Sequence, residues 1–382
     1  MRQFHIICVF SMILISCNMG SNKTGTGVND FSYINGEAID KELLFEIGPD
    51  HELVAGNFAN ARVLADGRIA ILDTRSISLH IVNSDGSLFS STSLEGRGPG
   101  EVENLSSNLG LLDGNRVALY DYLMAKFSLY VYAENLFNYV QDFILEPSMS
   151  VDNYYYYSPN QLILHRSTSR MSESQHESVT LFTTDEPLTE KKVLQIPKHQ
   201  DLSVSTSEGS LNLMFNYSSK YHTRNNICAF RGTIYYNRTD SVGFKVHDLN
   251  SGAQLANYNM DVPAILLTRE EKESEVDDFI GDTNDLFNSI DRDQLIADMP
   301  EIKPLVNKVV CDLPDGIWMA LLNEQNESTW TLFSDSGRIK GILDPLPDES
   351  VISIHNGHLF TEESNDFGDI TFRAYRISLS DI

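Results

Sequence analysis

Two kinds of turn alternate along this chain, and apolar runs typical of β-strands lie between them. The first kind is a sharp turn with Gly or Asn, and it occurs at 66–67, 113–114, 159–160, 231–232, 315–316 and 356–357. The second kind has the chemistry of a hairpin turn, and it occurs at 85–86, 134–135, 185–187, 251–252 and 336–337. The last unit has the first kind of turn and lacks the second, so the final repeat is incomplete.

This repetition predicts an all-β fold, a six-bladed β-propeller in which each blade is a four-stranded sheet. The clearest internal match relates 68–73, Arg-Ile-Ala-Ile-Leu-Asp, to 116–121, Arg-Val-Ala-Leu-Tyr-Asp. A blade cannot bury both of its faces alone, so the blades must stack around an axis. The run 42–47 precedes the first blade. We predict that this N-terminal strand pairs with 371–379, closes the last blade and removes two open edges.

One segment interrupts the repeat. Residues 268–300 are acidic, and apolar residues recur there at helical spacing. Asp291 and Gln294 resemble a capping box at the start of a helix. The pattern predicts one helical insertion between blades 4 and 5, lying over one mouth of the ring. It is either a cap that packs on the propeller or a lid or docking element for a partner.

The N-terminus carries the most specific motif. Residues 6–15 form an apolar run that is too short to span a bilayer as a stable helix. The following Leu-Ile-Ser-Cys, ending at Cys17, resembles the lipobox of bacterial lipoproteins. In that family the bond before the cysteine is cut and the cysteine is acylated, and several acyl chains make a lasting anchor. An ordinary secretory signal or a chance cysteine is the alternative.

The chain therefore divides into three expected parts. We expect a lipoprotein signal peptide over 1–17 with lipid attachment at Cys17. A flexible tether rich in Gly, Ser, Thr and Asn is expected over 18–40. The propeller with its insertion is expected over 41–382.

The formal net charge of −26 over 382 residues limits the possible partners. An acidic surface repels phosphate backbones and anionic headgroups, which argues against nucleic-acid binding and against electrostatic docking to a membrane. Distributed carboxylates keep a large β protein soluble and discourage edge-to-edge pairing. Recruitment of cations by the field is the alternative.

Cys228 and Cys311 are the cysteines left for the folded domain. Both adjoin apolar runs, which predicts two buried free thiols. A disulfide between them is the alternative in an exported protein.

Two short segments supply candidate ligand contacts. The loop 96–101, Gly-Arg-Gly-Pro-Gly-Glu, lacks the register of a nucleotide-binding loop and precedes no helix. Arg97 and Glu101 in this loop could touch a ligand at the mouth of the ring, or they could form a structural ion pair. A run of four tyrosines contains Tyr155 and Tyr157, which could stack on a sugar or could pack between blades.

No catalytic signature is present. The chain has no Gly-x-Ser-x-Gly elbow, no His-Glu-x-x-His and no Cys/His zinc spacing. His355 and His358 lie on either side of a turn, which favours surface histidines over a metal pair. We therefore predict no cofactor and no metal, and the catalytic residues, if there are any, stay unknown.

The loop 96–101 after a first blade, the upstream lipobox and the Asp-Gly-Arg strand start at 66–68 together resemble the six-bladed β-propeller lipoproteins of Bacteroidetes, which are similar to NHL and TolB-like propellers. The resemblance covers most of 43–379. It implies a propeller and export to the cell envelope, with lipid anchoring at the outer membrane, and it implies no particular reaction.

These observations favour a non-enzymatic, lipid-anchored propeller that binds a protein or another ligand and reaches the membrane through its N-terminal lipid. One alternative is a propeller enzyme with an axial metal site, such as a lactonase-like hydrolase or a lyase. Its ligands would come from different blades, so sequence spacing could not show them. The other alternative is a glycan-binding surface lipoprotein.

Overall fold

The structure is a computed structural model. It describes residues 36–53, 57–112, 114–145, 149–168, 176–185, 187–198, 202–208, 211–217, 219–282, 291–312, 316–325, 327–343, 346, 349–365 and 368–379. The predicted signal peptide, Cys17 and most of the tether lie outside these residues. Within them, no helix has the length and apolar character that crossing a bilayer would require.

Four of the sheets are antiparallel, with four strands each in chain order. Their strands are β2 (Phe58–Val63), β3 (Ile69–Asp73), β4 (Ser78–Val82) and β5 (Leu88–Ser93); β6 (Gly110–Leu112), β7 (Arg116–Asp121), β8 (Lys126–Ala133) and β9 (Leu136–Ile144); β10 (Met149–Ser158), β11 (Gln161–Thr168), β12 (His176–Thr183) and β13 (Thr189–Pro197); and β16 (Asn225–Phe230), β17 (Thr233–Arg238), β18 (Gly243–Asp248) and β19 (Gln254–Asn259). A separate hairpin joins β14 (Leu202–Glu208) to β15 (Leu211–Tyr217).

The remaining strands form one eight-stranded sheet, in the order β20-β21-β22-β23-β1-β26-β25-β24. These strands are β1 (Glu37–Ile47), β20 (Val306–Asp312), β21 (Gly316–Leu322), β22 (Ser328–Phe333), β23 (Ile339–Leu343), β24 (Ser350–His355), β25 (His358–Ser364) and β26 (Ile370–Leu379).

The N-terminal strand explains why two expected blades are one sheet. β1 pairs antiparallel with β26, where Leu43 lies opposite Tyr375 and Ile47 lies opposite Phe372. This pairing confirms the predicted closure by residues 42–47. The first residues of β1 also pair in parallel with β23, with Glu37 opposite Gly341. The sequence predicts separate fifth and sixth sheets, and this prediction is wrong. The structure joins them into one sheet, because β1 pairs with β23 on one side and with β26 on the other.

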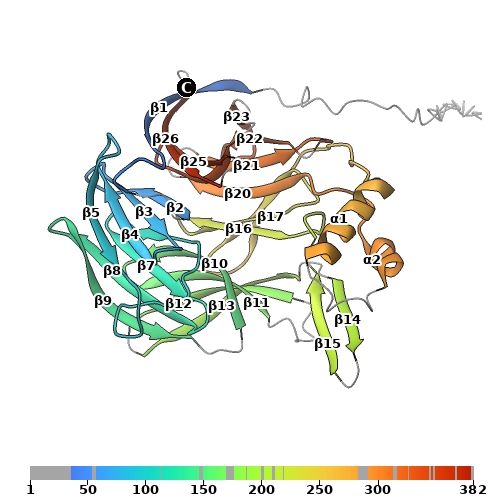
Figure 1. Cartoon of the computed structure of the whole chain (residues 1–382), viewed down its shortest axis with the longest axis horizontal. Coiled ribbons are helices and arrows are strands. Elements are labelled where there is room, and N and C mark those ends of the chain that lie inside the picture. Colours follow the sequence, from blue (N-terminus) through green and yellow to red (C-terminus); the bar gives the residue numbers. More distant parts are fainter. Residues whose placement is uncertain are drawn as a thin grey trace, which may run out of the picture.

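The sheets are arranged around a common centre, as in a propeller, with β2, β10, β16 and β20 near the middle of the view (Figure 1). The first strands of neighbouring sheets contact one another there, including β2 with β24, β6 with β10, and β16 with β20. Apolar clusters fill the spaces between sheets. One of them joins Leu72 and Ile81 to Leu119 and Tyr130. The fold is thus an all-β, propeller-like arrangement.

The repeated sequence motif has a local structural cause. The Asp73 carboxylate accepts hydrogen bonds from the backbone N–H groups of Asn57 and Arg75, at 3.0 and 2.9 Å. The Asp121 carboxylate does the same for the backbone of Glu103, at 2.8 Å. Each aspartate therefore ties the end of its strand to the loop that enters the sheet, because buried backbone donors need acceptors.

The helical insertion forms where the sequence predicts it, between β19 and β20, as α1 (Arg269–Asp282) and α2 (Arg292–Asp298). Asp291 caps α2 by accepting a hydrogen bond from the Gln294 backbone at 3.1 Å. The predicted place over the mouth of the ring is corrected. Figure 1 shows both helices at the outer edge of the sheets, beside β14 and β15.

The helices are held to the propeller by a small core and by ion pairs. Val276, Leu295 and Met299 are buried in one cluster. Nζ of Lys272 lies 2.8 Å from Glu301, and Nζ of Lys220 lies 2.9 Å from Glu275. Contacts at both helices favour a packed cap over a mobile lid, because a lid would need to break them.

A disulfide joins Cys228 of β16 to Cys311 of β20, with the two Cα atoms 5.8 Å apart. The prediction of two free thiols is therefore wrong, and the alternative holds. Strands far apart in sequence come side by side at the centre of the fold, and this proximity brings the two sulfurs together.

Candidate functional site

A cavity of about 420 Å³ lies where the first strands of the sheets meet. We call it the axial cavity. Its walls are formed by β2, β6, β10, β16, β20 and β24, together with the residues that lead into β6. Neither α1 nor α2 contributes to the described lining. Because each four-stranded sheet and the eight-stranded sheet supply part of the wall, this cavity depends on the whole ring.

The lining is cationic. Arg62, Arg231, Lys308 and His355 face the cavity, along with the amides of Asn60, Asn108 and Asn153 and the hydroxyl of Ser353. No aspartate or glutamate occurs among the described lining residues. The chain as a whole has a net charge of −26, so a lining with cationic side chains and no described carboxylate is unusual for this protein. Carboxylates in the lining would neutralise the charges of the arginines and the lysine.

Lys308 is half-buried on β20. Its Nζ donates hydrogen bonds to the backbone oxygens of Val351 and Ile352, at 3.2 and 2.9 Å. Burial lowers the pKa of Lys308 to about 8, and the charge of Arg62 lowers it further in the same direction, while Glu362 opposes both. The lysine is therefore mostly charged at pH 7, although its charge is poorly compensated.

His355 on β24 supplies a neutral donor. Burial lowers its pKa to about 3, with Arg62 and His358 acting in the same direction. Its Nδ1 accepts a hydrogen bond from the backbone N–H of Val63 at 3.1 Å. A backbone N–H can only donate, so the proton of the neutral ring must sit on Nε2.

The four tyrosines lie on β10, and all of them line the axial cavity. The Tyr154 hydroxyl donates to the Asn108 backbone oxygen at 2.6 Å, and the Tyr155 hydroxyl donates to the backbone oxygen of Ile227. Burial raises the pKa of Tyr156 to about 12 and also raises the pKa of Tyr155. Tyr155 and Tyr157 pack partly against the core between the third and fourth sheets. The two predicted candidates therefore combine packing with a place in the cavity wall.

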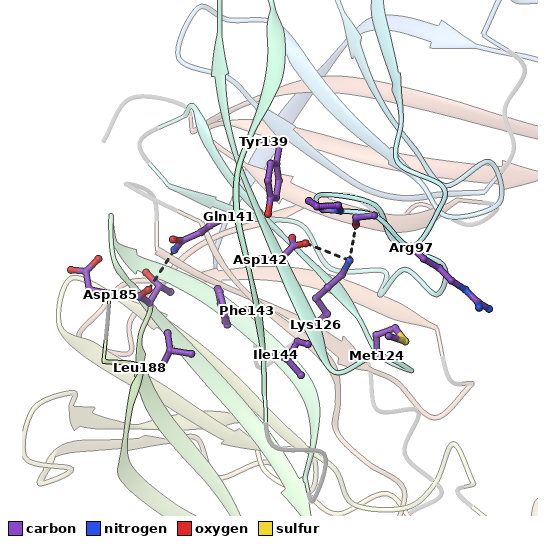
Figure 2. A pocket seen from close by; sticks show the side chains of 13 residues that line it. Arg97, Met124, Lys126, Tyr139, Gln141, Asp142, Phe143, Ile144, Asp185 and Leu188 are labelled. Carbon is purple, nitrogen blue, oxygen red and sulfur yellow. Dashed lines mark hydrogen bonds and ion pairs between the residues drawn. The ribbon is translucent and has the colours of Figure 1, made fainter.

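Arg97 lies elsewhere and lines an open groove of about 770 Å³ along β9, and Glu101 belongs to the same loop without lining the groove. The Arg97 side chain is 80% exposed and pairs with Glu103 at 2.6 Å, while Glu101 accepts a hydrogen bond from the Gly98 backbone at 2.7 Å. Figure 2 shows Lys126 directed toward Asp142, with Arg97 standing apart. The structure does not bring these two candidates to the axis, and their polar groups serve the loop itself.

A third group of side chains could in principle hold a metal ion. The ligand atoms of Asp152, His165 and Glu177 lie within 4.8 Å of one another on β10, β11 and β12. These atoms already interact: His165 Nε2 lies 2.8 Å from Glu177 Oε2, which also accepts a hydrogen bond from Asn225 at 2.9 Å. Glu177 Oε2 already accepts a hydrogen bond from the Asn225 amide. The three side chains therefore form a hydrogen-bond network rather than a cation site.

Arg62 and Lys308 were not singled out from the sequence, and His355 was predicted to be a surface histidine. The available signal was a charged residue within an apolar run of a predicted blade. Arg62 lies within β2 and Lys308 within β20. Charged side chains are seldom packed into the core of a sheet, so a charged residue inside a strand marks a place where that strand borders a cavity.

No protein-family model matches this chain, and no curated protein matches it. Among solved structures, a member of the DUF4221 family from Bacteroides vulgatus has a TM-score of 0.58 and 8% identity, covering 90% of this chain and 98% of that one. A Bacteroides fragilis protein classed as exported has a TM-score of 0.52 and 12% identity, covering 89% and 95%. A virginiamycin B lyase from Staphylococcus aureus has a TM-score of 0.42 and 10% identity over 90% of each chain. The first two similarities show a shared fold.

Proposed function

We propose that this chain is an exported, lipid-anchored six-bladed propeller that binds a small anionic ligand in its axial cavity without catalysing a metal-assisted reaction. The observation that carries the proposal is the lining: Arg62, Lys308 and His355 border a space in which no described residue contributes a carboxylate. Charged donors in a partly dehydrated cavity bind anions more strongly than the same groups in water.

The energetic state of Lys308 supports a binding role. Burial and Arg62 lower the pKa of Lys308 to about 8. Below that pH the lysine is charged, and its charge costs the fold free energy. An anion in the cavity would relieve that cost by supplying the missing opposite charge. Groups with perturbed pKa values in a cavity are common at binding sites.

The metal-dependent alternative needs carboxylate and amide oxygens from several blades at the axis. The described lining offers the amides of Asn60, Asn108 and Asn153 and the ring of His355, without carboxylates. The three positively charged side chains of the lining, Arg62, Arg231 and Lys308, would oppose the entry of a divalent cation. The lining therefore favours an anion over a metal ion.

Several observations support the six blades and the export. In the eight-stranded sheet, β20 to β23 and β24 to β26 with β1 are two antiparallel four-stranded units, which we interpret as blades five and six. The lipobox ending at Cys17 indicates export and anchoring. The disulfide between Cys228 and Cys311 fits an oxidising compartment such as the cell envelope.

The test is calorimetric titration of the purified domain with phosphate, citrate and, as an uncharged ligand of similar size, glucose. We expect citrate or phosphate to bind and glucose to fail. Arg62→Met and Lys308→Met should each weaken anion binding about tenfold or more, because each removes a charge-assisted contact. Arg97→Ala is the matched control, since it removes a positive charge from the outer groove. Equal weakening by Arg97→Ala, or no anion binding by the unaltered protein, would overturn the proposal.

A further inference from the structure

The amine of Lys308 has an arrangement that anion binding alone does not require. Its Nζ is held between two backbone oxygens of β24, those of Val351 and Ile352, at 3.2 and 2.9 Å. A neutral lysine amine has two N–H bonds and one lone pair. When both N–H bonds point to these two oxygens, the lone pair is left directed away from β24, and Lys308 lines the axial cavity.

The charged and titratable groups around this amine favour its neutral form. Arg62 on β2 opposes a second positive charge, and Glu362 on β25 acts in the other direction. Glu362 Oε2 is buried and accepts no hydrogen bond from any described residue. Arg231, His355 and the four tyrosines of β10 are the other titratable groups in the described lining. Burial lowers the pKa of His355 and raises the pKa values of Tyr154, Tyr155 and Tyr156, so it favours the neutral form of each. A lysine that is desolvated or lies next to another cation is a known form of activated nucleophile.

We propose that Lys308 is a nucleophile that forms an imine with a small anionic carbonyl compound, of the 2-oxo acid class, bound in the axial cavity. This inference rests on the proposed function, because it assigns the ligand class of the same site. Arg62 binds the carboxylate, and the adjacent carbonyl carbon is then presented to Nζ. The Nε2–H of His355, on the neighbouring strand, is a donor suited to the carbonyl oxygen.

The step balances without any oxidant or reductant. The Nζ lone pair forms a bond to the carbonyl carbon, and the carbonyl oxygen receives a proton. The two hydrogens of the neutral amine and the carbonyl oxygen then leave as one water molecule, and a carbon–nitrogen double bond replaces the carbon–oxygen double bond. Hydrolysis reverses the same steps, so the free ligand and the free lysine are regenerated.

The experiment traps the imine. The purified domain is incubated with pyruvate and cyanoborohydride, which reduces an imine to a stable secondary amine, and the modified residue is located by peptide mass spectrometry. Lactate, an anion without a carbonyl group, and acetone, a carbonyl compound without a charge, are the control ligands. Lys303 is an internal control, because it is a buried lysine on the same chain segment whose Nζ pairs with Glu271.

We expect adducts on Lys308 with pyruvate, at least tenfold fewer with acetone, none with lactate and none on Lys303. Arg62→Met should reduce pyruvate labelling more than acetone labelling, because only pyruvate loses a carboxylate contact. Acetone labelling should also fall, because without Arg62 the pKa of Lys308 rises and less of the amine is neutral. Lys308→Arg keeps the charge, so it should still bind phosphate while forming no adduct at this position. Labelling should increase between pH 7 and pH 9 as the amine loses its proton.

Two failures can be told apart. If phosphate or citrate binds but pyruvate leaves Lys308 unmodified over this pH range, the nucleophile is refuted and the anion site stands. If no anion binds and acetone modifies Lys308 as well as pyruvate does, the anion site is refuted, and with it the assigned ligand class.

Discussion

Replacement of Lys308 by methionine should change the pH dependence of stability in a direction that the structure determines. A lysine in an unfolded chain has a pKa of about 10.4. Burial and Arg62 lower the pKa of Lys308 in the fold to about 8. The fold therefore binds this proton more weakly than the unfolded chain does. The resulting cost to stability is fully present below the folded pKa and disappears as the pH rises toward the unfolded pKa.

The magnitude follows from the difference between the two pKa values. At pH 7 the charged amine costs the fold about 3 kcal/mol, at roughly 1.4 kcal/mol for each unit. By about pH 9.5 most of the amine in the fold is neutral, and the remaining cost is about 1.4 kcal/mol. The unaltered protein should therefore gain about 2 kcal/mol relative to Lys308→Met between these pH values. The lost bonds to Val351 and Ile352 cost about 1 kcal/mol each at both pH values, so they cancel from this difference.

Urea unfolding at pH 7 and pH 9.5, at constant ionic strength, measures this difference by linear extrapolation. Lys308→Arg is the control, because arginine stays charged at both pH values and should show no such gain over Lys308→Met. A difference between the unaltered protein and Lys308→Met that stays constant within about 0.5 kcal/mol would refute the reasoning about burial and Arg62.

Three further predictions concern the fold. Joint replacement of Cys228 and Cys311 by serine should lower the unfolding free energy by about 4 kcal/mol in urea, because the bridge closes a loop of 83 residues; a loss below about 1 kcal/mol would contradict this. Ile47→Ala should lower the unfolding free energy by about 2–5 kcal/mol and promote aggregation, because Ile47 is fully buried where β1 closes the ring. Leu43→Ala, at an exposed position of the same strand, is the control and should lower it by less than about 0.5 kcal/mol. Burial would raise the pKa of Asp73, but the nearby His80 ring and hydrogen bonds from Ser76 and Asn57 lower it well below its usual range. The stability advantage over Asp73→Asn should therefore be present at neutral pH and disappear as the pH falls below about 4, and equal curves at all pH values would oppose this.

The turns and the closing strand were predictable from the sequence because they depend on local chemistry. Gly67 has a φ of 85° and Gly114 a φ of 68°, a backbone region that other residues avoid, so glycine marks these turns directly. The run 42–47 was recognisable because it was a strand without a partner in its own repeat. Its pairing with β26 follows from the need to cover an open edge.

The position of the helical insertion could not be predicted to the same degree. Helical spacing shows that a helix forms and which of its faces is apolar. It does not show which loops that face will contact, and here Val276 and Leu295 pack beside Tyr221 at the outer edge. In the same way, apolar neighbours indicated that the two cysteines adjoin the core but could not show that β16 and β20 place them side by side.

The sequence by itself determined the repeat, its turns, the order of strands within the four-stranded sheets and the strand that closes the ring, because each of these depends on residues that are neighbours along the chain or on one unpaired run. Only the tertiary structure decided the axial cavity and its charge. Arg62, Lys308 and His355 come from three separate strands, and their common environment exists only after the ring has closed. The electrostatic effect of one charge on another depends on distance and burial, and neither quantity is set by separation along the chain.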